Sequence, residues 1–222
     1  MIAATLASLL TDQERPGTSD CEAITAGFFG QPINTLSSLG LVVAGVWLAI
    51  VLRPGRDRPL AWAYIGLLIA NGLGSVIYHG PAPSWARFVH DLPIASTTLL
   101  VALLLAVGMR RALVPWALGT VVLAVIIAFF PDAAVPMTGV LALAVGVLAV
   151  MRFVRVRKFS GSWKLETAAL AALALGAAFT ALGRTGEPLC EPYSLFQPHS
   201  LWHLLMAVAL LLLGLAMFRD PH

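Results

Sequence analysis

Charged residues are scarce in this chain, and their scarcity excludes an ordinary water-soluble domain. Only 11% of its 222 residues are Asp, Glu, Lys or Arg, whereas 59% are hydrophobic. A soluble domain carries about 25% charged residues, enough to cover a surface that faces water. The net charge of +3 does not indicate a nucleic-acid partner. No loop is long enough to hold a second domain, so we expect one compact bundle.

The hydrophobic residues fall into seven long blocks. A bilayer core about 30 Å thick requires roughly 20 apolar residues per helix. The blocks span residues 34–52, 60–79, 92–109, 112–130, 134–153, 165–182 and 201–218. We therefore expect an all-α, multi-pass integral membrane protein with an extracytoplasmic segment at 1–33 and a seven-helix transmembrane domain at 34–222. Residues 1–10 are too short to span, and we interpret them as an interfacial stretch.

Basic residues divide unevenly between the two sides that alternate loops would face. Eleven of the 14 Lys and Arg residues fall on one side, and Arg15, Arg87 and Arg184 fall on the other. Basic loops favour the cytoplasmic side of a membrane. We therefore expect the N-terminus outside and the C-terminus in the cytoplasm. Adding or losing one span would destroy this division, so it also supports the count of seven.

The two cysteines, Cys21 and Cys190, both fall on the outer side in this topology. Because the outer compartment is usually oxidising, a disulfide between the N-terminal segment and the loop before the last helix is one interpretation. Two unrelated buried thiols are the other.

Four of the five histidines map to the outer ends of the predicted spans. His79 closes the second block, His90 opens the third, and His199 and His203 open the seventh. Residues four apart lie on one face of a helix, so His199 and His203 can present two imidazoles to one metal ion. A catalytic zinc site uses three protein ligands and keeps one open position. His79, His199 and His203 supply that number.

Two further polar residues accompany these histidines. Ser75 lies one helical turn before His79 on the same face, and Asp91 follows His90 directly. Each has an ordinary interpretation as well, because a membrane-helix serine often bonds the preceding turn and an aspartate often caps a helix. Paired histidines also bind haem. Ionisable residues near a membrane are costly and hence usually functional, and here they converge from three helices.

The motifs GSVIYHG, VHDLPI and HSLWHLL occur in this order across the seven spans. Together with the early segment CEAITAGFFGQPINTLSSLG, they resemble the alkaline ceramidase family, part of the CREST superfamily of membrane hydrolases. The resemblance extends from about residue 19 to residue 210. It implies a seven-helix, zinc-dependent enzyme that acts on a lipid.

Site residues follow from this resemblance. It implies zinc bound by His79, His199 and His203, with Ser75 and Asp91 as catalytic residues beside the metal. It also implies a disulfide between Cys21 and Cys190. Family members carry calcium at acidic residues near the Cys-Glu segment. Gln31 stands here where a second glutamate is expected, so Asp20, Glu22 and Gln31 predict at most a weak calcium site.

We therefore expect hydrolysis of the amide bond of an N-acyl lipid of the ceramide type. In this mechanism Asp91 acts as general base and acid, and Ser75 stabilises the oxyanion. A nucleophilic Ser75 is the less favoured role, and His90 has none assigned. The alternatives are an ester-lipid hydrolase, a receptor or scaffold with structural zinc, a haem protein and a transporter. The expected partner is a membrane lipid, and no feature indicates an oligomeric state.

Overall fold

The computed structural model describes residues 17–55, 58–156 and 162–219 of the chain. In that part, seven helices are long and apolar enough to cross a membrane. They are α2 (Pro32–Leu52), α3 (Pro59–His79), α4 (Ala86–Val107), α5 (Met109–Phe129), α6 (Ala134–Val156), α7 (Trp163–Leu182) and α8 (Pro198–Phe218), and a short 3₁₀ turn, η1 (Pro131–Ala133), precedes α6. The predicted all-α fold with seven membrane-length helices is confirmed.

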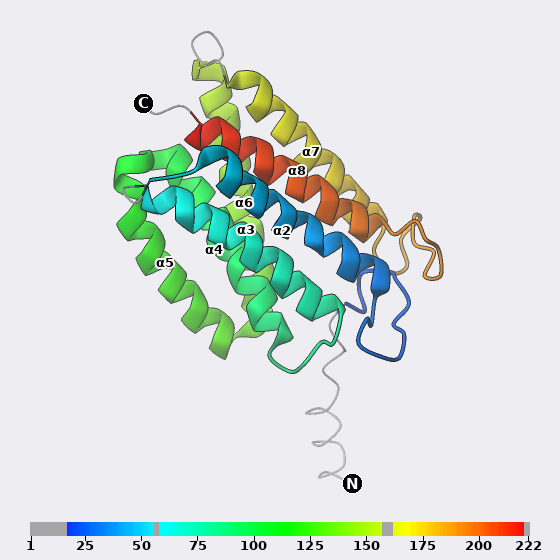
Figure 1. Cartoon of the computed structure of the whole chain (residues 1–222). Helices are drawn as coiled ribbons and strands as arrows, with labels where there is room; N and C mark the ends of the chain where they lie inside the picture. Colours follow the sequence, from blue (N-terminus) through cyan, green and yellow to red (C-terminus); the bar gives the residue numbers. More distant parts are fainter. Residues whose placement is uncertain (1–16, 56–57, 157–161, 220–222) are drawn as a thin grey trace.

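Hydrophobic side chains lie on all sides of these helices, as expected for a bundle surrounded by lipid. The helix α2 packs between α3 and α8, α4 packs on α3, and α7 packs on α8 (Figure 1). Leu48, Tyr64 and Leu68 are completely buried between them. The Tyr64 hydroxyl donates a hydrogen bond of 2.7 Å to the Leu210 carbonyl, which satisfies the one polar atom of that ring.

Six of the seven helices begin within three residues of the expected positions. Three of them, α2, α3 and α8, begin with a proline. Proline lacks a backbone N–H, and it suits this position because the N–H groups of the first helical turn have no partner within the helix. The helix α4 is the exception, since it begins at Ala86 and not at residue 92. Hydropathy marks only the apolar part of a helix, and the first turns of α4, which contain Arg87, His90 and Asp91, are helical too.

The early start of α4 changes the interpretation of Asp91. Trp85 is the N-cap of this helix, so Asp91 lies inside it and the capping alternative is wrong. Pro93 lies one turn after Val89 and cannot donate to its carbonyl. A side chain on Gly74 would collide with this carbonyl, so the glycine permits a close approach of α3 and α4. This close approach brings the C-terminal end of α3, which carries His79, near the N-terminal part of α4, which carries His90.

The N-terminal segment, residues 17–31, folds against the same end of the bundle as the loop at 183–197 (Figure 1). A disulfide joins Cys21 to Cys190, with the two Cα atoms 5.5 Å apart, so the predicted pairing is confirmed. The segment also contacts α3, where the Gln31 N–H donates to the His79 carbonyl at 2.8 Å. We call this end of the bundle, where α3 ends and α8 begins, the histidine end.

Candidate metal centre

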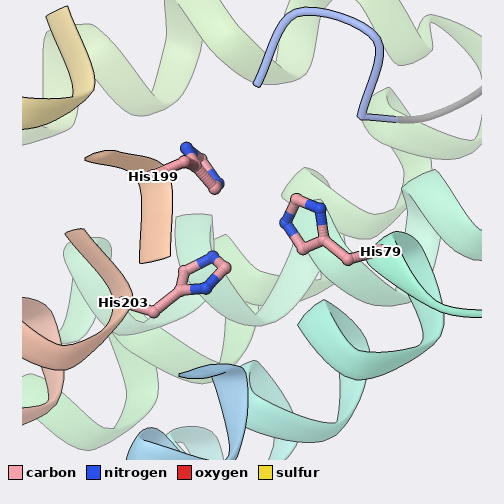
Figure 2. Close-up of side chains that lie close together, drawn as sticks. All are labelled: His79, His199 and His203. Atoms are coloured by element: carbon pink, nitrogen blue, oxygen red, sulfur yellow. The ribbon is translucent and has the colours of Figure 1, made fainter. Parts of the chain in front are cut away.

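Three histidines from two helices meet at the histidine end. His79 is the last residue of α3, and His199 and His203 lie one turn apart at the start of α8. Their rings face a common space, with His79 on one side and the other two opposite (Figure 2). The ring centres are 5.1 Å apart from His79 to each partner and 4.6 Å apart between His199 and His203. The predicted ligand set is therefore assembled in the fold.

A glutamine fixes the orientation of the His79 ring. The amide nitrogen of Gln31 donates to the carbonyls of Gly17 and Glu22 at 2.9 and 2.8 Å, so its carbonyl oxygen faces His79 Nδ1 at 2.7 Å. A carbonyl oxygen can only accept, and therefore Nδ1 carries the proton. A side chain on Gly17, whose φ is +88°, would collide with this amide oxygen. The lone pair of the His79 ring is thus on Nε2.

Two serines of α2 orient His203 in the same way. The hydroxyls of Ser37 and Ser38 lie 3.0 and 3.3 Å from His203 Nδ1. Both also lie within hydrogen-bond distance of the Asn34 carbonyl, at 3.0 and 2.7 Å. A hydroxyl has one proton, and the carbonyl can only accept it, so each serine oxygen is left to accept from Nδ1–H. The lone pair of His203 is again on Nε2.

The third histidine has a carboxylate as its partner. His199 Nδ1 lies 3.6 Å from an Asp20 carboxylate oxygen, and this oxygen accepts a hydrogen bond from the Ser19 hydroxyl at 3.2 Å. Burial raises the pKa of the Asp20 carboxyl above its usual value. An oxygen partner at Nδ1 is typical of histidines that bind a metal through the other nitrogen. Each of the three rings in the centre has an oxygen atom near its Nδ1.

These residues fit a metal ion. One nitrogen from each of the three rings lies within 4.8 Å of the other two. Zinc–nitrogen bonds are about 2.0–2.1 Å long, so small ring rotations bring the three nitrogens to one ion. His79 Nε2 is fully buried and has no hydrogen-bond partner among the described residues. A buried acceptor without a partner is unfavourable, and a cation satisfies it.

The two predicted catalytic residues lie in different surroundings. The Ser75 hydroxyl is buried and lies 3.4 Å from His203 Nε2. Asp91 accepts a hydrogen bond of 2.7 Å from His90 Nδ1, and the His90 ring stacks on Tyr78 with 4.2 Å between ring centres. His90 rather than Asp91 is the residue that lines the adjoining cavity. Asp91 is therefore joined to this site through His90.

The three residues considered for calcium have separate protein partners. The Glu22 carboxylate accepts from the backbone N–H groups of Ile33 and Asn34 at 2.7 and 2.8 Å, where it caps α2. Gln31 is held between Gly17, Glu22 and His79, and Asp20 faces His199. In the described part of the chain, the three histidines are the group that converges on a possible ion. Calcium stays a prediction.

A long cavity leads away from the histidine end into the bundle. Its volume is about 240 Å³, and its walls are mainly aliphatic. Ser75, His199 and His203 line one end of it. At the far end Arg152 of α6 and Glu166 of α7 form an ion pair of 3.6 Å. Residues of both α6 and α7 line this cavity.

The fold and the centre together define a seven-helix membrane protein with a candidate histidine metal site beside an apolar cavity. Comparison with known proteins finds no protein-family profile and no curated protein that matches the chain. The site must therefore be interpreted from its own geometry and from the motifs of the sequence.

Sequence reasoning missed the residues that hold the histidines and line the cavity. Gln31 was considered only for calcium, and Ser37 and Ser38 were not considered at all. A signal for the serines exists, since polar residues are unusual in the first turns of so apolar a helix as α2. Asn71, Ser75 and His79 are spaced four residues apart, and this spacing marks one polar face of α3.

Proposed function

We propose that this protein is a zinc-dependent membrane hydrolase that cleaves the amide bond of an N-acyl lipid of the ceramide type. The observation that carries the proposal is the cluster of three histidines at one end of an apolar cavity, which His199 and His203 line. The cavity accommodates a hydrocarbon chain, and the histidines lie where the chain meets its polar group. The resemblance of the motifs to the alkaline ceramidases supports the same reaction.

The proposed mechanism assigns one task to each polar residue. His79, His199 and His203 bind the metal, and Gln31, Asp20 and the two α2 serines keep each Nδ1 occupied. When bound, zinc lowers the pKa of a water ligand and polarises a carbonyl group. The Ser75 hydroxyl donates a hydrogen bond to the developing oxyanion. Asp91, paired with His90, accepts a proton and passes it to the leaving amine.

Two features favour a catalytic over a purely structural metal. Structural zinc sites are closed by four protein ligands, whereas catalytic sites have three and an open position. Within the described ranges, no fourth His, Cys, Asp or Glu joins the three histidines. The centre also adjoins the cavity, which a structural site does not require. A nucleophilic role for Ser75 is disfavoured because the imidazole beside it is assigned to the metal.

The decisive experiment combines metal analysis with a lipid-hydrolysis panel on purified protein. We expect about one zinc ion per chain, no haem absorbance, and turnover of N-acyl lipids in preference to ester lipids. His203→Ala should lose the zinc and the activity, while His222→Ala serves as the control. Full activity without metal would refute the site. Bound zinc without turnover of any amide or ester lipid would favour a receptor or scaffold.

A further inference from the structure

One face of α3 carries a column of polar residues that runs from the candidate metal centre into the cavity. His79, Ser75 and Asn71 follow one another at intervals of four residues. With a rise of 1.5 Å per residue, Ser75 lies about 6 Å and Asn71 about 12 Å along the helix from His79. Both Ser75 and Asn71 line the cavity. Asn71 is 4% exposed, so a polar amide is buried in a mainly aliphatic wall.

The hydrogen bonds around Asn71 fix the orientation of its amide. The Thr97 hydroxyl donates its only proton to the Pro93 carbonyl at 2.7 Å. Thr97 Oγ1 must therefore accept in its contact with Asn71, and the amide nitrogen Nδ2 donates to it at 2.8 Å. This leaves the amide oxygen, Oδ1, on the other side. It is buried and has no hydrogen-bond partner in the described part of the chain.

An unpaired buried acceptor is unfavourable and favours a ligand that brings a donor. A plain hydrocarbon chain has no O–H or N–H group and would leave Oδ1 unpaired. A chain with a hydroxyl at the depth of Asn71 would satisfy it. The bare chain is thus the poorer match for this wall.

We propose that Asn71 Oδ1 accepts a hydrogen bond from a hydroxyl group on the acyl chain of the substrate, close to the scissile carbonyl. This inference rests on the proposed function, which places the carbonyl beside Ser75. In the arrangement we propose, the amine half of the lipid, which carries the polar headgroup, stays at the histidine end, and the acyl half fills the cavity. Asn71 lies one turn, about 6 Å, deeper than Ser75, which places the hydroxyl within the first few carbons. The substrate class is therefore the hydroxyacyl amide lipids.

The test compares matched lipids that differ only in one hydroxyl group. Purified full-length protein is given amides of hexadecanoic acid and of its 2-, 3-, 4- and 12-hydroxy derivatives, and kcat/KM is measured for each. We expect a hydroxyl near the carbonyl to raise kcat/KM on the order of tenfold, as one hydrogen bond allows. The 12-hydroxy chain should show no gain. Equal values for all five lipids would overturn the subsite.

Two variants assign the preference to a residue. Asn71→Leu keeps the approximate size and should bring the ratio of hydroxylated to plain substrate to about one. Thr98→Val is the matched control, because Thr98 also lines the cavity and its hydroxyl donates to the Ile94 carbonyl at 2.8 Å. The control should keep the preference. If Thr98→Val loses it and Asn71→Leu keeps it, the assignment to Asn71 is wrong.

Binding without turnover separates this inference from the proposed function. The free 3-hydroxy and unsubstituted fatty acids compete for a fluorescent fatty-acid probe bound to the same proteins. Tighter binding of the 3-hydroxy acid that depends on Asn71, with no hydrolysis of any lipid, would support the subsite and refute the hydrolase. Hydrolysis without preference for the hydroxyl would support the hydrolase and refute the subsite.

Discussion

At the scale of single residues, the orientation of the three rings is what makes this cluster a candidate metal site. Gln31, Asp20 and the serines of α2 each face an Nδ1 atom, so the opposite nitrogens remain for a ligand. Such partners commonly change metal affinity about 10–100-fold when removed. We therefore expect the metal affinity of the candidate centre to depend on residues outside the ligand set.

Gln31 offers a direct test of this dependence. Gln31→Leu removes the oxygen that accepts from His79 Nδ1, and we expect zinc affinity to fall about 10–100-fold. Gln31→Glu is the matched variant, because it keeps an acceptor for His79 and loses the donors to Gly17 and Glu22. Affinities are measured by competition with a chelator. An equal loss in both variants would show that Gln31 acts by holding the N-terminal segment.

Asp91 separates an enzyme from a receptor. Asp91→Asn keeps the side-chain size and removes its basicity, so turnover should fall roughly 10²–10⁴-fold. Zinc content should be nearly unchanged, because the three imidazoles remain. Ser75→Ala should cost about 10²–10³-fold, as the loss of one oxyanion donor does. Hydrolysis and metal content are measured on the same preparations.

His90 provides the companion variant for Asp91. His90→Phe keeps an aromatic ring on Tyr78 and removes the hydrogen bond to Asp91. We expect a smaller loss than in Asp91→Asn, since the carboxylate remains. An Asp91→Asn protein that hydrolyses lipid at the parental rate would contradict the mechanism, and an equal loss in His90→Phe would place the proton path through His90.

At the scale of elements, the N-terminal segment is part of the site although it lies outside the helices. It contributes Asp20 and Gln31, and its backbone is bonded to both α3 and the loop before α8. Cys21, with φ of 68°, is the middle residue of a tight turn in which the Glu22 N–H donates to the Asp20 carbonyl at 2.9 Å, and the Glu22 carboxylate caps α2. The disulfide to Cys190 ties this segment to the loop that leads to His199. The covalent link thus joins two elements of one centre.

Removal of the disulfide should therefore weaken metal binding as well as stability. We expect the double variant Cys21→Ser, Cys190→Ser to unfold at a lower temperature and to bind zinc less tightly, because Asp20 and Gln31 are no longer held in place. Thermal unfolding and chelator competition measure the two effects. In the parent protein, nonreducing mass mapping should yield a Cys21–Cys190 peptide. Two freely alkylated thiols in native protein would contradict the bond.

At the scale of the whole molecule, polar groups are divided between the two ends of the bundle. The histidine end holds the candidate centre, and the opposite end holds Arg58, Arg111 and the Arg152–Glu166 pair. The cavity runs between these ends. A lipid chain in it would lie along the helices, with its reactive group at the histidine end.

The basic residues predict which end faces the cytoplasm. Because basic loops favour that side, the histidine end should face outward. A reporter that is active only in the cytoplasm should work when fused after His222 and fail when fused before Met1. The opposite pattern would place the histidine end in the cytoplasm.

The sequence alone determined the seven helices and the chemical identity of the ligand set. Both depend on local patterns, namely apolar blocks of membrane length and polar residues repeated every four positions. Helix α4 began earlier than expected because hydropathy does not mark polar helical turns. The disulfide was predicted from the resemblance and from the side on which both cysteines fall, and the structure confirms it.

Only the tertiary structure decided what surrounds these residues. Gln31 reaches His79 across 48 positions, and Ser37 reaches His203 across 166. No local spacing encodes such contacts, because they arise when α2, α3 and α8 pack. The same packing places His90 rather than Asp91 at the cavity wall and turns Asn71 Oδ1 away from Thr97. Helices follow from neighbours in sequence, whereas the site follows from neighbours in space.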